Sequence, residues 1–155
     1  MVTEINNGLI LHVKKFNELT VDELYNVLQV RSAVFVVEQN CIYQDLDNDD
    51  QNSIHLWLTN ADNNKILAVA RVCPADTHMK EVSIGRVTST ERGCHYGLTI
   101  IENAVKAAIH EFNASVIEIE AQEYTKEFYE KVGFIQTSEA FLLDGIPHIK
   151  MTYKV

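Results

Sequence analysis

The chain has 155 residues, of which 46% are hydrophobic, and a formal net charge of −9. This size and apolar content predict a single domain over residues 1–155 with a sizeable core. The negative charge would repel a phosphate backbone, so nucleic acid is not an expected partner. Residues 1–7 lack the features of a secretion signal, and no apolar run approaches the roughly 20 residues that span a bilayer. We therefore expect a cytoplasmic protein without membrane contact.

The three cysteines, Cys41, Cys73 and Cys94, are odd in number and lack CxxC spacing. A disulfide framework or a zinc site would need paired cysteines, so we expect three reduced thiols. The chain has two prolines and no low-complexity linker, which indicates no internal domain boundary.

The first third of the chain contains one strand pattern and two helical ones. Residues 9–14 are typical of a strand. Thr20, with Glu23 at the capping-box position, predicts the start of a helix, and a second helical segment over residues 33–39 follows it. The polar residues 44–53 indicate a loop.

Three strands are predicted next, over residues 54–59, 66–73 and 82–88. The polar turn at residues 60–64 joins the first two strands as a hairpin. A helix over residues 98–112 follows the third strand.

The remainder of the chain is predicted to end in antiparallel strands. A strand over residues 116–122 precedes a helix that ends near Phe134. A short strand, a hairpin through Asp144-Gly145 and a final strand over residues 149–153 complete the order.

A basic, glycine-bearing turn joins the strand over residues 82–88 to the helix over residues 98–112. It reads Arg92-Gly93-Cys94-His95-Tyr96-Gly97. The backbone N–H groups of such a turn and the positive end of the helix face an anion held there. A strand, turn, helix and strand in this order are suited to holding a pyrophosphate.

This arrangement, with a following helix that ends in Phe128-Tyr129 and Gly133-Phe134, resembles motifs A and B of the GNAT acetyltransferase superfamily. The order of the elements is similar to the GNAT order over nearly the whole chain. The resemblance implies an α+β fold with a single mixed, largely antiparallel sheet of six to seven strands, flanked by about four helices.

Five separated segments look like signatures of the ElaA-type branch of that superfamily. They cover residues 34–40, 43–50, 84–87, 121–122 and 144–148. The substrates of this branch are poorly defined. The resemblance therefore specifies the expected fold and cofactor more closely than the acceptor.

The resemblance implies acetyl-CoA as the cofactor, with no metal. The cofactor would be held by backbone groups of one strand, by the turn and by an amide in the next strand: Val87, Thr88, Arg92, Gly93, Cys94, His95, Tyr96, Gly97 and Gln122. The segment between Val87 and Arg92 is about two residues shorter than is usual in the superfamily, which could alter a strand bulge.

His95 departs from the superfamily pattern because it replaces a glycine of the phosphate turn. Unless His95 adopts a left-handed conformation, its N–H would point elsewhere. A protonated imidazole could instead pair with a phosphate.

Tyr129 matches the superfamily tyrosine that protonates the departing thiolate, and the alternative is a core tyrosine. Glu38, at the end of a helical segment, is expected to act as the base or to bind the amine; alternatively it caps the helix or pairs with Arg31. Glu118 and Glu120 alternate with isoleucines, so both lie on one sheet face and offer a rival base.

Arg31, His55 and His148 are expected to contact the acceptor, although either histidine could be structural. Residues 45, 47 and 49 repeat the spacing of a calcium loop, but Asp50 and Leu56 replace the glycine and glutamate that such a loop needs. A metal site is therefore not expected. The loop is predicted to be either an acidic lip that attracts a cationic acceptor or a solvated segment.

The predicted function is acetyl-CoA-dependent N-acetyl transfer, directly to an amine of a small molecule or peptide. A polyamine, an amino-sugar, a small amine and a peptide N-terminus all stay open as acceptors, and so does a homodimer. The alternatives are a non-catalytic CoA-binding regulatory module and a purely protein-binding domain.

Overall fold

A computed structural model describes residues 1–5 and 8–155, and this part of the chain forms one nine-stranded sheet with three α-helices. The strands are β1 (Val2–Ile5), β2 (Leu9–Lys15), β3 (Ile54–Asn60), β4 (Ile66–Cys73), β5 (Val82–Ser89), β6 (Val116–Gln122), β7 (Ile135–Gln136), β8 (Phe141–Leu143) and β9 (Ile146–Lys154). The helices are α1 (Val21–Arg31), α2 (Tyr96–Phe112) and α3 (Lys126–Val132), with 3-10 turns η2 (Phe16–Glu18), η4 (Asp50–Asn52) and η5 (Glu123–Thr125).

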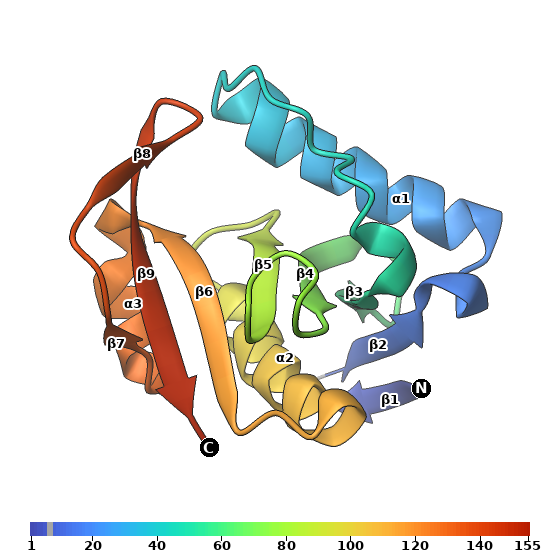
Figure 1. The fold of residues 1–155 in the computed structure, drawn as a ribbon. Helices are drawn as coiled ribbons and strands as arrows, with labels where there is room; N and C mark the ends of the chain where they lie inside the picture. Colours follow the sequence, from blue (N-terminus) through green and yellow to red (C-terminus); the bar gives the residue numbers. More distant parts are fainter. Residues whose placement is uncertain (6–7) are drawn as a thin grey trace.

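The sheet is mixed and largely antiparallel, as expected. Its order is β1-β2-β3-β4-β5-β6-β9-β7, with β8 paired to β9. Among the described strands, β5 and β6 form the parallel pair, and they are joined only at Val82–Ile117 and Ser83–Glu118. Beyond these two pairs the strands diverge, and β6 with β9 swings away from β5 (Figure 1).

The sheet has two more strands than the upper expected number. β1 was not predicted, because its side chains are mostly exposed and it carries little apolar pattern. It is held in the sheet by antiparallel pairing with β2, in which Val2 of β1 lies opposite His12 and Ile5 lies opposite Leu9.

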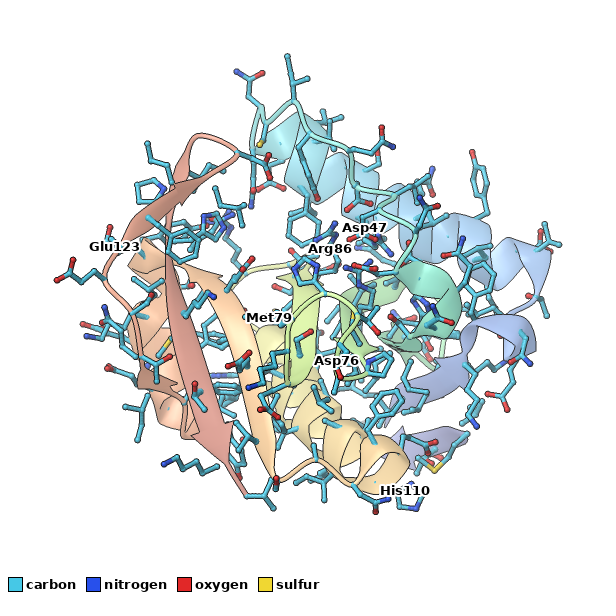
Figure 2. All side chains as sticks on the ribbon, viewed as in Figure 1. Asp47, Asp76, Met79, Arg86, His110 and Glu123 are labelled. Carbon is cyan, nitrogen blue, oxygen red and sulfur yellow. The ribbon has the colours of Figure 1, made fainter. Side chains whose placement is uncertain are left out.

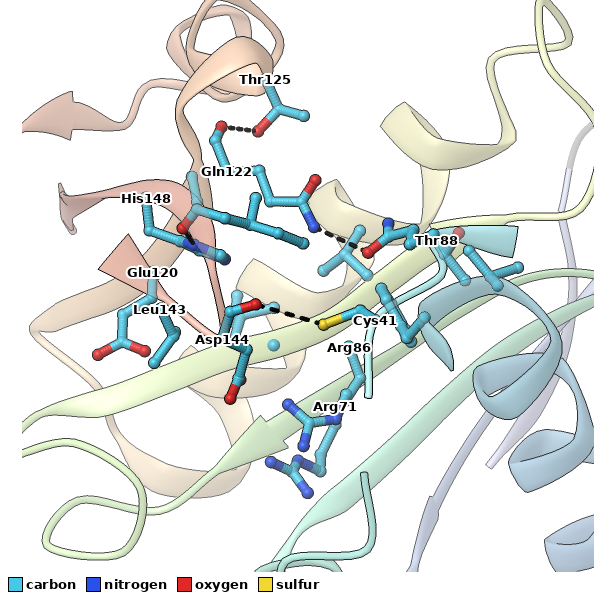
Figure 3. Close-up of a pocket in the computed structure, with 18 of the residues that line it drawn as sticks. Cys41, Arg71, Arg86, Thr88, Glu120, Gln122, Thr125, Leu143, Asp144 and His148 are labelled. Carbon is cyan, nitrogen blue, oxygen red and sulfur yellow. Dashed lines mark hydrogen bonds between the residues drawn. The ribbon is translucent and has the colours of Figure 1, made fainter. Parts of the chain in front are cut away.

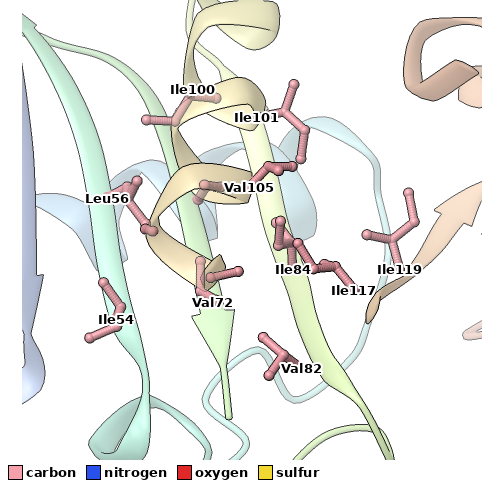
Figure 4. Close-up of a cluster of buried hydrophobic side chains, with 14 of the residues drawn as sticks. Ile54, Leu56, Val72, Val82, Ile84, Ile100, Ile101, Val105, Ile117 and Ile119 are labelled. Atoms are coloured by element: carbon pink, nitrogen blue, oxygen red, sulfur yellow. The ribbon is translucent and has the colours of Figure 1, made fainter. Parts of the chain in front are cut away.

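Helix α2 covers one face of the sheet, and the main core lies between them. Ile100, Ile101 and Ala104 of α2 are fully buried against strand residues such as Leu56 and Ile117 (Figure 4). Helix α3 packs against this same core through its partly buried aromatic and aliphatic side chains.

Helix α1 covers the opposite face. Val27 of α1 packs with Trp57 and Val69, whereas Leu56 and Leu58, the neighbours of Trp57, belong to the core under α2. Successive side chains of a strand point to opposite faces, so this division identifies the two layers.

The start of α1 is the predicted one. Thr20 accepts a hydrogen bond from the Glu23 N–H at 3.1 Å, and the Glu23 side chain accepts one from the Thr20 N–H at 2.9 Å. The second helical segment is the π-helix η3 (Ser32–Glu38), which continues directly from α1. π-Helical turns are rare and often lie at functional sites. Within the described residues, no helix has the length and apolar character needed to cross a membrane.

Candidate active site

A cleft of about 590 Å³ opens where β5 and β6 diverge. Its walls come from η3 and the following loop, from β5 and β6, from α3 and from the β8–β9 hairpin. Of the residues expected at the site, the lining includes Glu38, Val87, Thr88, Arg92, Gly97, Gln122, Tyr129 and His148.

A β-bulge shapes the β5 wall. Val69 pairs with Thr88 and Arg71 with Gly85, so a single β4 residue lies opposite both Arg86 and Val87. Arg86 has a φ of 54°, in the left-handed region. A bulge leaves local backbone groups outside the ladder. The short segment after Val87 therefore still permits a bulge beside the cleft.

The turn before α2 adopts the left-handed conformation at His95 that the replacement of a glycine requires. His95 is left-handed, with φ 60° and ψ 13°, and Gly93 has a φ of 77°. A side chain in this conformation costs about 1–2 kcal/mol, yet it lets the turn lead into α2 at Tyr96 as a glycine would. Cys94 and His95 are exposed, and neither belongs to the cleft lining.

Arg92 reaches into solvent at the mouth of the cleft, where its side chain is 90% exposed. Its Nη2 donates to Oε1 of Glu38 at 3.1 Å. Glu38 therefore pairs with the expected phosphate ligand rather than with Arg31.

Tyr129 approaches the cleft from α3. It is half-buried, and its ring meets Phe128 and Phe134 edge-on at centroid distances of 5.0 and 5.9 Å. Burial raises the pKa of the Tyr129 hydroxyl above its ordinary value, so the group carries its proton throughout the neutral range.

Two contacts bridge the cleft between distant segments (Figure 3). The Gln122 side chain donates to Oε1 of Gln39 at 3.0 Å, which joins β6 to the residue after η3. The Cys41 thiol lies 3.6 Å from the carbonyl oxygen of Asp144 and so joins the same segment to the β8–β9 hairpin.

A network of ion pairs adjoins the cleft, and its members Asp47, Arg71 and Arg86 line it. Arg31 is 1% exposed and donates to Asp45 at 3.1 Å and to Asp50 at 2.7 Å. The expectation that Arg31 contacts an acceptor is therefore corrected: carboxylates enclose its guanidinium and satisfy it.

The acidic loop takes part in this network, which corrects the expectation of an acidic lip. Arg71 donates to both oxygens of Asp47, at 2.7 and 2.8 Å, and Arg86 donates to Asp45 at 2.7 Å. Figure 2 shows Asp47 and Arg86 side by side beside β5. Burial would raise the pKa of Asp47, but the hydrogen bonds and charge of Arg71 hold it below its ordinary value.

The prediction that His55 contacts the acceptor is wrong, whereas His148 lies in the cleft lining. His55 is 1% exposed, and its Nε2 lies 2.9 Å from the carbonyl oxygen of Asp50. Burial lowers the pKa of His55, so it is a neutral structural histidine. His148 lines the cleft at the start of β9, with its Nδ1 2.7 Å from the carbonyl oxygen of Ile146.

His78 was not predicted to belong to the site, but it lines the cleft from the loop over residues 74–81. Its Nδ1 lies 3.2 Å from Oδ2 of Asp49, and its Nε2 lies 3.7 Å from Oε2 of Glu120. The loop carries no periodic pattern or motif, so no sequence signal marked this histidine.

Ligand atoms of Asp47, Asp49 and His78 lie within 4.8 Å of one another. Both oxygens of Asp47, however, accept hydrogen bonds from arginine. This cluster is better described as an extension of the ion-pair network than as a cation site.

Residues 18–155 match the sequence profile of the acetyltransferase (GNAT) domain. The chain belongs to the GNAT family. It is 38% identical to protein ElaA of Escherichia coli over 141 residues, which cover 90% of this chain and 92% of that protein. A UPF0039 protein of Schizosaccharomyces pombe is 42% identical over 141 residues, 89% of this chain and 92% of the relative.

Solved structures agree with this assignment. An acyl-CoA N-acyltransferase from Pseudomonas aeruginosa superposes with a TM-score of 0.86 at 36% identity, covering 94% of this chain and 99% of the other. Escherichia coli ElaA superposes with a TM-score of 0.85 at 34% identity, covering 99% and 100%. The GNAT fold and the ElaA-type assignment are thereby confirmed, and the family supports an acyltransferase that uses a CoA thioester.

Proposed function

We propose that this GNAT protein is an acetyl-CoA-dependent N-acetyltransferase that transfers the acetyl group directly to an amine of a small molecule or peptide. The observation that carries the proposal is the cleft between β5 and β6. It has a β-bulge on one wall, the turn with left-handed His95 at one end and Tyr129 at the side.

Each part of the cleft has a role in this proposal. Arg92, the backbone of the turn over residues 92–97 and the first turn of α2 bind the pyrophosphate. The bulge at Val87 and Thr88 offers backbone groups to the pantetheine arm, and Gln122 borders the same passage. Acetyl-CoA supplies an activated acyl group when bound.

Tyr129 is the proposed proton donor to the leaving thiolate. It belongs to α3, on the same side of the sheet as α2, whose first turn would hold the pyrophosphate. The CoA portion is therefore proposed to bind on the α2–α3 side. The acceptor then approaches from the α1–η3 side, where Glu120 and His148 line the cleft.

The test is isothermal titration with acetyl-CoA, followed by a thiol-release assay over a panel of spermidine, glucosamine, butylamine and a glycine-initiated peptide. Saturable binding together with thiol release that depends on one of the amines supports the enzyme. Binding without release from any of them supports the CoA-binding regulatory module. An absence of binding overturns both and favours a protein-binding domain.

A further inference from the structure

The attacking amine must lose a proton on the acceptor side of the sheet, opposite Tyr129. Glu38 is poorly placed for this because it pairs with Arg92 at the proposed phosphate end. On β6, Ile119 and Ala121 face the core while Glu120 and Gln122 alternate with them. Since Gln122 bonds to Gln39 beyond η3, Glu120 faces the α1–η3 side as well.

His78 and Glu120 line that side of the cleft, and Asp49 contacts His78 from outside the lining. The Asp49 carboxylate lies 3.2 Å from Nδ1 of His78. A proton on Nδ1 donated to Asp49 leaves Nε2 as an acceptor, and Nε2 is the nitrogen that faces Glu120. The 3.7 Å between Nε2 and Glu120 Oε2 exceeds a direct hydrogen bond, so an amine can bond to both atoms.

We propose that His78 is the general base for the acceptor amine, that Asp49 orients its imidazole, and that Glu120 binds the amine as a cation. This inference rests on the proposed function and narrows the acceptor to an amine that is charged in solution.

The electrostatics of the cluster agree with these roles. Glu120 and Asp49 raise the pKa of His78 above its ordinary value, against burial and the charge of Arg71. His78 chiefly lowers the pKa of Glu120, and Lys150 and His148 add to this effect, so Glu120 stays a carboxylate. Asp47, also close to His78, is neutralised by Arg71.

The proton balance is complete with these groups. His78 Nε2 takes one proton from the ammonium and later passes it to water. The amine lone pair forms the N–C bond, the C–S bond breaks, and Tyr129 gives its proton to the thiolate. The nitrogen loses its second proton to solvent, from which Tyr129 regains one, so each turnover releases one net proton.

The kinetic test measures kcat/KM against pH for the wild type, His78→Gln, Asp49→Asn and Glu120→Gln, using the panel amine that reacts fastest. We expect His78→Gln to lose about 10²-fold at pH 7, with unchanged acetyl-CoA binding and a gap that closes toward pH 10, where the free amine is abundant. Removing either carboxylate lowers the pKa of His78, so the acid limb of the profile shifts to lower pH. Glu120→Gln additionally raises the KM for the amine.

Two matched controls separate position from charge. Glu118, the other carboxylate considered as a base, lies on the same face of β6 but outside the cleft lining, so Glu118→Gln removes a carboxylate away from the site. His110→Gln removes an exposed histidine at the end of α2. Both should keep the wild-type profile. Wild-type activity of His78→Gln at pH 7, an equal loss at every pH, or the same acid-limb shift in Glu118→Gln would overturn the proposal.

A second measurement needs no acceptor. NMR titration of the histidine ring protons, with the His78 signal assigned by its loss in His78→Gln, should give a pKa above 6.5 that falls in Asp49→Asn and in Glu120→Gln. A pKa at or below 6.5 contradicts the inference even if no panel amine reacts. Failure of acetyl-CoA binding in the wild type would instead contradict the proposed function.

Discussion

Arg92 and Glu38 form an ion pair of 3.1 Å across 54 residues of sequence, and both side chains line the mouth of the cleft. The guanidinium that would hold a pyrophosphate is therefore already occupied by a carboxylate in the free protein. Binding of the cofactor has to break this pair or share it.

The first prediction concerns this pair. Arg92→Ala should weaken acetyl-CoA binding by about ten- to a hundred-fold, the scale of one charge-assisted hydrogen bond. Glu38→Gln should instead strengthen binding, because it removes a competing and repelling carboxylate. Calorimetric titration at two salt concentrations measures both, and the wild-type affinity should fall as salt rises. Weaker binding in Glu38→Gln would show that the carboxylate supports the site.

The second prediction concerns His95. Its left-handed backbone is unfavourable for a side chain, so His95→Gly should raise the free energy of unfolding by about 0.5–1 kcal/mol. His95→Ala, which keeps a Cβ, should give no such gain. Urea unfolding of the three proteins measures this. A loss of stability in His95→Gly would mean that contacts of the imidazole outweigh the backbone effect.

The third prediction concerns the buried network. Burial would raise the pKa of Asp50, but Arg31 and Arg71 hold it below its ordinary value. A lowered pKa in the folded state gives stability that is complete above the unfolded pKa of about 3.9 and is lost as pH falls through the folded pKa. Asp50→Asn should therefore cost about 3–5 kcal/mol at pH 7 and much less near pH 2.

Denaturant unfolding at both pH values checks this prediction. Asp62→Asn, in the exposed turn between β3 and β4, is the control and should change stability little. An Asp50→Asn protein as stable as the wild type at pH 7 would show that the network contributes little net stability.

The fourth prediction concerns the thiols. Cys94 is exposed beside the first turn of α2, whereas Cys41 and Cys73 are buried. A pyrophosphate bound at this turn would cover the exposed Cys94 thiol and keep the alkylating reagent away from it. Mass spectrometry after brief alkylation should therefore find one fast thiol that acetyl-CoA protects. Equal modification with and without acetyl-CoA would remove Cys94 from the neighbourhood of the phosphate.

Local sequence rules predicted the parts of the fold that depend on neighbouring residues. The Thr20–Glu23 capping box, the alternation along β6 and the Asp144–Gly145 hairpin follow from spacing and turn chemistry. The resemblance to the GNAT family extended these elements to the whole sheet. The family also pointed to Tyr129 before any geometry was known.

The roles of charged residues could not be predicted in the same way. Arg31 finds its carboxylates 14 and 19 residues further along the chain, and His78 meets Glu120 only because the fold brings a loop onto β6. Such pairings depend on tertiary structure, and no local pattern distinguishes a buried arginine from one that binds substrate. The acceptor side of the cleft was therefore the least predictable part.

Tyr129→Phe tests the central claim most directly. The change keeps the ring packing against Phe128 and Phe134 but removes the proposed proton donor. With a saturating panel amine, turnover should fall by about 10²-fold or more while acetyl-CoA binds as in the wild type. Full turnover in a correctly folded Tyr129→Phe protein would contradict the assignment and show that His148 or solvent protonates the thiolate.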